Sequence, residues 1–380
     1  METAIRKIQM VDLNAQYDRI KTEVDTAVLE VISTAAFING PKVKSFQANL
    51  ERYLGVKHVI PCANGTDALQ IAMMAADLQP GDEVIVPAFT YVATAEVIAL
   101  LRLRPLMVDV DPHTFNITAE IIEQAITPRT KAIVPVHLFG QSCDMAPIME
   151  VAKRHNLIVI EDNAQAIGSD YTAGGHTRKA GTIGHIGCTS FYPSKNLGCY
   201  GDGGAIFTND SELAEKCQMI ANHGQSKQRY YHDVVGVNSR LDSIQAAVLD
   251  IKLTHLDEYA AARQRAAAYY DAAFRDLAHV EIPARQHNST HVFHQYTLIV
   301  KDGKRDALQA HLQALNIPTM IYYPVPLYKQ KAYSEAMANK TDHLAVTDFL
   351  CKTVLSLPMH TELDEDTLAY ICDAVRSFGA

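Results

Sequence analysis

Short apolar runs that alternate with helical patterns limit what this chain can fold into more than any other feature. The runs are rich in β-branched residues, which is typical of strands buried on both faces of a sheet. They occupy residues 84–86, 106–108, 132–136, 157–160 and 205–207. Helical patterns lie between several of them, at residues 93–101, 119–125 and 146–155. This alternation favours right-handed crossovers, so the first two thirds of the chain is predicted to be an α/β layer with a mostly parallel sheet.

A second, smaller domain is expected in the last third of the chain. Residues 239–277 contain no Gly or Pro and predict a long helical region with at most a short break. A strand candidate at residues 292–300, a helix at 305–315, a proline-bearing loop and two terminal helices follow. The chain has 380 residues, and one domain has roughly 100 to 200. We therefore expect a large domain at residues 1–250 and a small C-terminal α/β domain at residues 251–380.

Charge and cysteine content argue against several classes of protein. Lys and Arg number 34 against 43 Asp and Glu, a formal net charge of −9, which would repel a nucleic-acid backbone. The seven cysteines are scattered without a C-x-x-C pair, which fits a reducing cytoplasm. Arg6, Lys7, Asp12 and Asp18 stand where a signal peptide would be apolar. The most apolar stretch, residues 92–108, holds three charged residues and is too polar for a membrane span. We expect a cytoplasmic protein that binds neither nucleic acid nor membrane.

Three polar motifs are candidates for a functional site, and the first lies at a predicted helix start. Gly65 and Thr66 stand just before an apolar helical pattern at residues 68–76. Free amides at a helix start bind anions, although simple capping by Thr66 or Asp67 would explain the same residues. The chain contains neither a P-loop nor a dinucleotide-binding fingerprint, so any phosphate here would belong to another kind of ligand.

The second and third motifs follow predicted strands. Residues 161–165 come directly after the fourth apolar run and place Asp162 at the carboxyl edge of the sheet, where α/β folds bind ligands. A solvated strand end is the alternative. Lys195 lies in a turn-rich segment, with Ser190 five residues before it and glycines soon after. Most lysines are surface charges, but a partly desolvated lysine can form a Schiff base with an aldehyde.

The three motifs together suggest one ligand. An aldehyde would suit Lys195, and a phosphate would suit Gly65, Thr66 and Ser190. A protonated heterocycle would suit Asp162, because a fixed negative charge keeps the proton on the ring and the ring electron-poor. Pyridoxal 5′-phosphate carries all three groups.

With these motifs the chain resembles the DegT/DnrJ/EryC1/StrS family of pyridoxal-phosphate enzymes, the nucleotide-sugar aminotransferases of the aspartate aminotransferase fold. The resemblance covers nearly the whole chain. It extends to residues 40–41, 87–91, 135–141, 222–224, 236–241 and 323–327. It implies a three-layer α/β/α transferase fold with a mostly parallel central sheet, a smaller C-terminal α/β domain and a homodimer with shared active sites.

The resemblance also implies roles for single residues. Lys195 would hold pyridoxal 5′-phosphate covalently and would later move a proton between the substrate carbon and the cofactor. Asp162 would pair with the pyridine nitrogen, and Gln165 would lie against the ring near its phenolic oxygen. Tyr91 would stack on the opposite face.

The remaining implied contacts serve the phosphate and the substrates. The phosphate ligands would be Gly65, Thr66 and Ser190, with Asn238 reaching the phosphate in the neighbouring subunit. The residues suited to the diphosphate of the acceptor would be His223, Lys227, Arg229 and Arg240. The sugar would enter over Tyr322, Tyr323 and Tyr328. Many relatives have His in a Pro-Leu-His pattern at the position of Tyr328, a departure that concerns the acceptor and not the cofactor.

The activity implied is transfer of an amino group, with glutamate as the expected donor, to a keto group of a nucleotide-linked hexose in amino-sugar biosynthesis. Family members whose anchoring lysine is replaced by histidine act as dehydratases, so Lys195 favours transamination. A keto-cyclitol acceptor, as in aminoglycoside pathways, is one alternative. A regulatory protein that keeps the fold and the cofactor without turnover is another.

Two further groups of residues are assigned to packing or to the surface. His287, His291 and His294 are spaced four and three apart, but they run into a predicted strand, where residues three apart point to opposite faces. No metal site is therefore expected. Cys188 and Cys199 flank Lys195 without a nearby His or Arg in sequence, and we expect them to behave as small buried hydrophobes.

Overall fold

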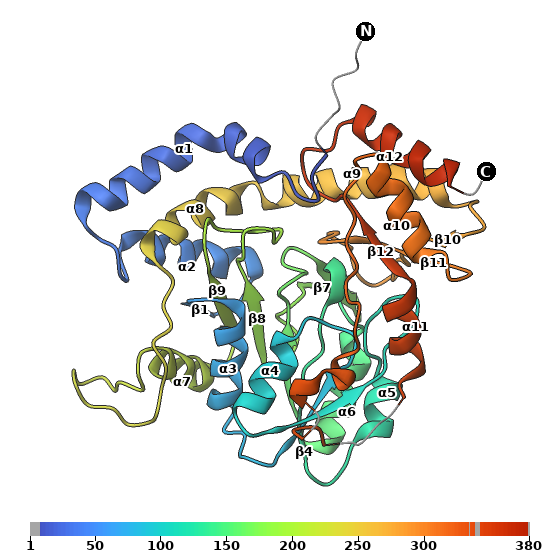
Figure 1. Cartoon of the computed structure of the whole chain (residues 1–380). Helices are drawn as coiled ribbons and strands as arrows, with labels where there is room; N and C mark the ends of the chain where they lie inside the picture. The colour runs from blue at the N-terminus through green and yellow to red at the C-terminus, as the bar shows by residue number, and fades with distance from the viewer. Residues whose placement is uncertain (1–7, 334, 339–342, 379–380) are drawn as a thin grey trace.

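The computed structural model describes residues 8–333, 335–338 and 343–378, and a seven-stranded sheet lies at its centre (Figure 1). From edge to edge the strands are β1 (His58–Cys62), β9 (Gly204–Thr208), β8 (Ile186–Ser190), β5 (Ile158–Asp162), β4 (Thr130–Ile133), β2 (Glu83–Pro87) and β3 (Arg104–Val108). Strand β9 is antiparallel to both of its neighbours. The other neighbouring pairs are parallel. The prediction of a mostly parallel sheet is confirmed.

Helices cover both faces of this sheet because successive strand residues point to opposite sides. Val84 and Val86 of β2 belong to an apolar cluster that also contains α3 (Gly65–Ala75), α4 (Ala93–Leu100) and α7 (Ser211–Ala221). Ile85 belongs to the opposite cluster, with α5 (Ala119–Ala125) and α6 (Met145–His155). At the β1 end this second face is covered by α2 (Pro41–Leu54) and α8 (Ser243–Thr254). The three-layer α/β/α architecture predicted from the sequence is confirmed.

A second sheet follows α9 (Leu256–Phe274), which continues the line of α8 across the top of Figure 1. Its strands, in order, are β10 (Val280–Glu281), β11 (Tyr296–Val300) and β12 (Val354–Leu357). Together with α9, α10 (Arg305–Ala314) and α12 (Glu365–Ser377), they enclose a separate apolar cluster. Helix α11 (Ala345–Thr353) packs instead against the cluster of α5 and α6.

The remaining elements lie at the margins of the two sheets. Helix α1 (Leu13–Thr34) packs on α8 through Ile20 and Val24, and β6 (Asp170–Ala173) with β7 (His176–Lys179) forms a hairpin. Single 3-10 turns are η1 (Leu138–Gly140), η2 (Leu327–Lys329) and η3 (Lys331–Tyr333). No helix within the described ranges is long and apolar enough to cross a membrane.

Several predicted boundaries were wrong, for local reasons. Helix α3 begins at Gly65 and not at residue 68, because the side chain of Asn64 caps it by accepting a hydrogen bond from the Asp67 amide. Strand β4 stops at Ile133, two residues before Pro135, which cannot donate to a strand ladder. Strand β11 starts at Tyr296 because Phe293 has a φ of 47°, which interrupts the extended conformation.

The glycine-dense segment 174–187 contains β7 and the first residues of β8. Gly174 and Gly175, with φ values of 57° and 79°, turn the β6–β7 hairpin. Gly187 lies inside β8, where a Cβ atom would stand 1.9 Å from the carbonyl oxygen of Gly181. This close approach requires a glycine. Strand β8 therefore lacks the continuous apolar run from which the other strands were predicted.

Candidate active site

The polar residues predicted to bind a ligand meet at the carboxyl edge of the central sheet. Asp162 is the last residue of β5 and pairs with Cys188 of β8, two residues before Ser190 ends that strand. A Cβ atom on Gly65, the first residue of α3, would lie 2.7 Å from the Cβ of Ser190. Two segments more than 120 residues apart in sequence are therefore in direct contact, and only a glycine at position 65 allows this approach.

Asp162 is buried and oriented by two hydrogen bonds. The Thr94 hydroxyl donates to Oδ2 at 2.7 Å, and the Ala164 amide donates to Oδ1 at 3.1 Å. The carboxylate is 6% exposed. The sequence analysis missed Thr94, although a polar side chain within the otherwise apolar helix α4 could have indicated a buried hydrogen bond.

Lys195 lies in the turn after β8, near Asp162. Burial lowers the pKa of Lys195 to about 8, and the negative charge of Asp162 acts in the opposite direction. The turn is held on two sides, since Asn196 Nδ2 donates to the carbonyl of Val292 at 2.8 Å and Lys252 Nζ donates to the carbonyl of Gly198 at 2.9 Å. A lysine of this pKa keeps a substantial unprotonated fraction near neutral pH and can act as a nucleophile.

A histidine that sequence reasoning assigned to a strand also lies near Lys195. The pKa of His294 is held well below its usual range, first by burial and then by the positive charge of Lys195. Its Nδ1 atom is buried and has no hydrogen-bond partner among the described residues. The imidazole therefore stays neutral beside the lysine.

The helix start at Asn64 has the geometry of an anion site. The Asn64 side-chain oxygen accepts a hydrogen bond from the Asp67 amide at 2.8 Å, and the Asn64 carbonyl accepts one from the Ala68 amide at 3.1 Å. The amides of Gly65 and Thr66 precede them, in the first turn, where no intrahelical acceptor exists. Capping by Thr66 or Asp67, the alternative considered from the sequence, is wrong because Asn64 is the capping residue.

Gln165 and two tyrosines complete the group that the structure brings together. Gln165 Oε1 accepts from the Phe139 amide at 2.8 Å, and Gln165 Nε2 donates to the Tyr323 hydroxyl at 3.1 Å. The rings of Tyr91 and Tyr323 lie 6.3 Å apart, and Tyr91 is 57% exposed. The neighbouring Tyr322 ring is 5.9 Å from that of Tyr323. An open aromatic face thus adjoins the polar residues.

The chemistry of this group fits pyridoxal phosphate. The amine of Lys195 lies near the Asp162 carboxylate, which Thr94 orients. The first turn of α3, at Gly65, lies beside Ser190. These match the aldehyde, the ring nitrogen and the phosphate of that molecule. Among the described residues no group of three or more His, Cys, Asp or Glu side chains is placed to hold a metal ion.

The other predicted site residues do not all join this group. Tyr328 is buried, and its hydroxyl donates to Asp348 Oδ1 at 2.7 Å. Asn238 is exposed, one residue before Ser239, whose hydroxyl accepts from the Ala63 amide at 3.0 Å. The predicted diphosphate contacts belong to the segment 222–240, where His223, Lys227 and Arg229 are exposed and Arg240 is half-buried.

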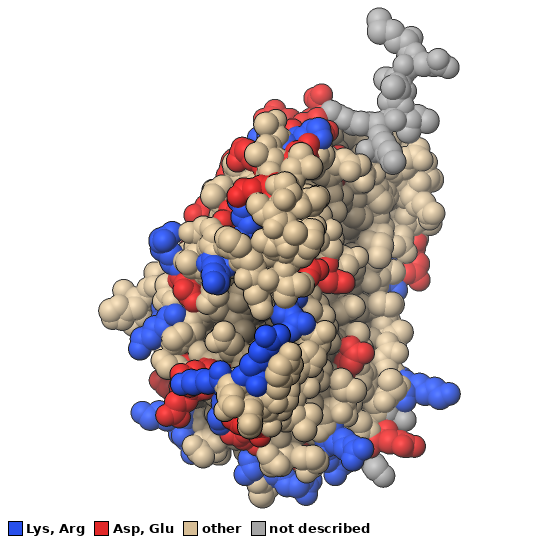
Figure 2. Space-filling model, turned by 90° about the vertical axis from the view of Figure 1, so that its left-hand side faces the viewer, with Lys and Arg blue, Asp and Glu red and all other residues tan. Residues whose placement is uncertain are grey.

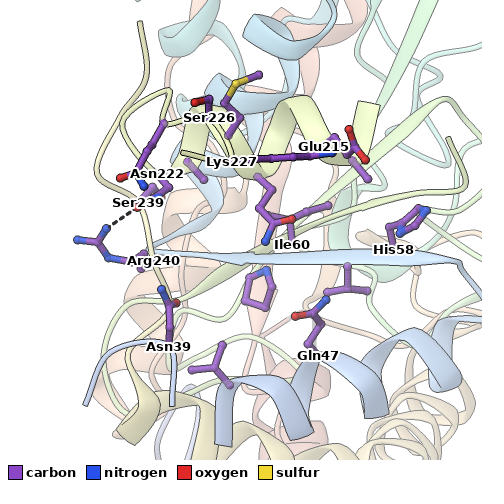
Figure 3. A pocket seen from close by; sticks show the side chains of 18 of the residues that line it. Asn39, Gln47, His58, Ile60, Glu215, Asn222, Ser226, Lys227, Ser239 and Arg240 are labelled. Atoms are coloured by element: carbon purple, nitrogen blue, oxygen red, sulfur yellow. Dashed lines mark hydrogen bonds between the residues drawn. The ribbon is translucent and has the colours of Figure 1, made fainter. Parts of the chain in front are cut away.

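A separate cavity of about 1090 Å³ adjoins this segment (Figure 3). Strand β1 crosses it between α2 and α7, and Arg240 lies at one end, with a 3.0 Å hydrogen bond to Asn222 Oδ1. Lys44 and Lys227 also line it, and Figure 2 shows Lys and Arg side chains gathered on this side of the molecule. Neither Lys195 nor Asp162 contributes to its wall.

A buried hydrogen-bonded pair of Glu161 and His137 on the reverse side of β5 was not predicted from the sequence. Glu161 is fully buried and lies 2.7 Å from His137 Nε2. It also accepts hydrogen bonds from the amides of Gly181, Ile183 and Gly184. His137 Nδ1 accepts from the Cys143 amide, so Nε2 is the protonated nitrogen that donates to Glu161. This network ties the ends of β4, β5 and the turn before β8 to one another.

Of the histidines and cysteines considered in the sequence, His291, Cys188 and Cys199 have packing roles and His287 is exposed. The His291 ring stacks on Phe293 with centroids 3.9 Å apart, and its Nδ1 accepts from the Phe293 amide. Cys188 and Cys199 are buried, and burial raises the pKa of both thiols. Neither thiol is therefore activated as a nucleophile.

Comparison with known proteins gives consistent matches along the chain. A model of the DegT/DnrJ/EryC1/StrS aminotransferase family matches residues 18–376. A UDP-2-acetamido-2-deoxy-3-oxo-D-glucuronate aminotransferase of Pseudomonas aeruginosa is 46% identical over 97% of this chain and 100% of its own length. A pleiotropic regulatory protein of Geobacillus stearothermophilus is also 46% identical, over 98% of both chains. The crystal structure of NtdA from Bacillus subtilis with bound cofactor PMP is 30% identical, with a TM-score of 0.89 over 99% of this chain and 86% of that one.

Replacing Glu161 by Gln should lower the free energy of unfolding by about 3 kcal/mol at pH 7, because a buried charge network loses its charge and one acceptor position. Burial alone would raise the pKa of Glu161, but the hydrogen bonds from His137, Gly184 and Gly181 outweigh it and lower the pKa. The carboxylate therefore stabilises the fold above about pH 4.3, the unfolded value. That stability is lost as the pH falls through the lowered pKa.

Urea unfolding of both proteins between pH 3 and pH 7 measures this difference, which should shrink on the acid side. The exposed Glu150→Gln variant is the control and should stay within about 0.5 kcal/mol of the parent. A difference between parent and Glu161→Gln that does not change with pH would contradict the role given to the charge.

Proposed function

The chain belongs to the DegT/DnrJ/EryC1/StrS aminotransferase family, and on this basis we propose that it uses pyridoxal phosphate to transfer an amino group from glutamate to the 3-keto group of a UDP-linked 2-acetamido sugar. The family membership and the aminotransferase activity predicted from the sequence are confirmed. The observation that carries the cofactor assignment is Lys195, with a pKa of about 8, near a carboxylate fixed by Thr94 and Ala164.

Pyridoxal phosphate, when bound, supplies an electron-poor ring that stabilises negative charge at the amine carbon. Lys195 would hold its aldehyde covalently, and after release Lys195 Nζ would move a proton from the substrate carbon to the former aldehyde carbon of the cofactor. Asp162, held by Thr94, would keep the ring nitrogen protonated. Gln165 would lie against the ring near its phenolic oxygen, and Tyr91 would stack on the opposite face.

The phosphate would be bound by the first turn of α3, through Gly65 and Thr66, and by Ser190. Three observations support this assignment: the Asn64 cap, the contact between Gly65 and Ser190, and the helix dipole behind the first amides. The PMP bound by NtdA is the aminated form of the same cofactor and supports the cofactor class.

The acceptor is proposed from the relatives and from the aromatic edge of the site. The Pseudomonas aeruginosa relative acts on a 3-oxo sugar of the UDP series. Tyr322 and Tyr323 adjoin Tyr91 at the exposed side of the site, where a sugar ring can pack on aromatic faces. A keto-cyclitol acceptor remains the alternative enzyme substrate.

A regulatory role without turnover is supported by one observation, the 46% identity to a protein named as a pleiotropic regulator. The arrangement of Lys195, Asp162 and Thr94 argues against it, because a buried lysine with a lowered pKa near a fixed carboxylate is typical of a catalytic site.

We further propose that the active protein is a homodimer in which Asn238 reaches the partner's cofactor. Two sets of exposed apolar side chains favour this proposal, because a second copy of the chain would cover them. They lie at the end of α1 and on the segment 222–240, and they are Leu29, Ile32, Phe37, Ile38, Tyr230, Tyr231 and Val235. The cavity between α2 and α7, lined by Lys44, Lys227 and Arg240, would then be closed by the partner and could receive the diphosphate.

The domain division and the location of the protein are also proposals. The apolar cluster of the C-terminal sheet includes α9, α10 and α12, while α8 packs on α1 and α2, so a boundary near residue 250 is supported by the break between α8 and α9 at His255. A cytoplasmic location is supported by the seven free, buried cysteines.

Borohydride reduction of the protein loaded with pyridoxal phosphate should leave the cofactor mass on the peptide that contains Lys195. Lys252 provides an internal control, because burial lowers its pKa to about 8 as well, and its Nζ bonds to the Gly198 carbonyl. Peptide mass spectrometry distinguishes the two sites. Label on Lys252, or label that persists unchanged in Lys195→Ala, would refute the covalent role of Lys195.

Incubation with L-glutamate and UDP-2-acetamido-2-deoxy-3-oxo-D-glucuronate should yield the 3-amino sugar and 2-oxoglutarate in equal amounts. A keto-inositol in place of the sugar should give at least a hundredfold lower kcat/KM, because it lacks the diphosphate that the basic side chains would bind. The products are quantified by mass spectrometry. Preference for the keto-inositol would favour the cyclitol alternative, and a spectral response to glutamate with no product from any keto acceptor would favour the regulatory one.

Mixing Lys195→Ala chains with Asn238→Ala chains should restore activity after subunit exchange. If Asn238 serves the partner's site, each hybrid dimer contains one site with both residues intact and one with neither. Activity should therefore rise well above the sum of the separate variants, up to about half the parent value per hybrid dimer. The mixed steady-state rate measures this, and analytical ultracentrifugation checks the dimer. A rate equal to the sum of the two variants would show that Asn238 acts within its own chain.

A further inference from the structure

The loop that carries Tyr322 and Tyr323 crosses from the small sheet to the active-site edge. At its start Met320 exchanges two backbone hydrogen bonds with Ser356 of β12, at 3.1 and 2.8 Å. At its end the Leu327 amide donates to the carbonyl of Ala88, three residues before Tyr91, at 3.1 Å. The middle of the loop is exposed at Pro324 and Val325. Its position over the site thus depends on how well its far end is held.

That far end is held by a compact polar cluster around Asp348. The Tyr328 hydroxyl donates to Asp348 Oδ1 at 2.7 Å, and Lys329 Nζ donates to the same oxygen at 2.6 Å. His343 Nδ1 lies 2.9 Å from Oδ2. The Tyr328 hydroxyl also accepts from the Leu344 amide at 3.2 Å. Two consecutive loop residues are therefore tied to one carboxylate.

The carboxylate itself stands on a fixed helix. Asp348 lies in the first turn of α11, and the Asp109 side chain after β3 accepts from the amides of Val346 and Thr347 at 2.9 and 2.7 Å. The cluster therefore connects the loop end to the large sheet. Tyr328 is only 6% exposed, so its hydroxyl is committed to this cluster and its ring to the apolar cluster of α3 and α4.

We propose that Tyr328 and Asp348 form a clamp that fixes the loop 321–327 over the site and thereby sets the affinity for the acceptor sugar. Tyr328 is then a positioning residue and not the direct sugar contact expected from the sequence. This inference rests on the proposed function for its acceptor. The cofactor side of the loop is held separately, through Tyr323 and Gln165, so the clamp should act on the acceptor more than on the reaction with glutamate.

Tyr328→Phe tests the clamp with a matched control, Tyr171→Phe. The Tyr171 hydroxyl also donates to a carboxylate, that of Asp144, and also accepts a backbone amide, from Ala146, while its ring is 3% exposed. The two substitutions thus remove the same kind of hydrogen bonds in different places. Asp348→Asn is the second clamp variant, because it keeps the size of the side chain and removes the charge. Circular dichroism and thermal melting check that each variant is folded.

Three measurements are made on the protein loaded with pyridoxal phosphate. Tyr328→Phe should raise KM for UDP-2-acetamido-2-deoxy-3-oxo-D-glucuronate by roughly tenfold, the effect of losing one hydrogen bond to a charged group. Its kcat and its rate of spectral change with L-glutamate alone should stay within about twofold of the parent. Amide hydrogen exchange of the segment 320–330 should become faster in Tyr328→Phe and Asp348→Asn and stay at the parent rate in Tyr171→Phe.

Exchange that is equally slow in the parent and both clamp variants would overturn the proposal, as would a loss of the glutamate reaction as large as the loss with the sugar. If the parent protein reacts with glutamate but never aminates the sugar, the proposed acceptor is wrong. The exchange measurement still decides on the clamp in that case, because it needs no acceptor.

Discussion

A fully buried carboxylate, Glu161, is the constraint on which the site depends. Its oxygens accept hydrogen bonds from His137, which follows β4, and from three amides of the turn that leads into β8. Burying an ionised carboxylate is costly unless its oxygens are paired, so these strand ends cannot move apart without leaving charge and amides unpaired. Because neighbouring residues of a strand point to opposite faces, fixing Glu161 also fixes Asp162, the residue for which we propose the contact with the cofactor. The reactive edge is therefore rigid for reasons that lie on the reverse side of the sheet.

The layered fold and the grouping of Lys195, Asp162 and Ser190 could be predicted from the sequence, while several contacts that orient them could not. Strands buried on both faces leave a continuous apolar run in the sequence, and β2, β3, β5 and β9 were predicted from it. Strand β8 was missed because packing against Gly181 requires a glycine within it. Thr94 and Glu161 act through partners 68 and 20 or more residues away, and no local pattern reveals such pairs. Tyr328 was assigned to the sugar from the family resemblance, and nothing in the neighbouring sequence indicated that its hydroxyl would donate to Asp348.

The sheet edge around Asp162 and the loop 321–327 are stabilised in different ways. Around Asp162 the hydrogen bonds are buried and short, and each partner comes from a regular element or from the turn beside it. The loop 321–327 is exposed in its middle and depends on contacts at its ends. Substitutions in such a loop change few buried contacts, so the proposed contacts with the acceptor can vary while the residues around Lys195 stay the same.

The antiparallel direction of β9 shortens the connection that carries Lys195. Strand β8 ends at the reactive edge, the turn with Lys195 follows, and β9 leads away from that edge before α7 returns to it. The segment after α7 comes back beside Ala63, at the end of β1 and next to the cap of α3. Had β9 been parallel, a crossover of a dozen or more residues would have been needed before it, and α7 would then have ended at the opposite rim. The reversal of β9 therefore places the turn with Lys195 and the segment with Asn238 at the same edge of the sheet. A neighbouring molecule could contact both segments there.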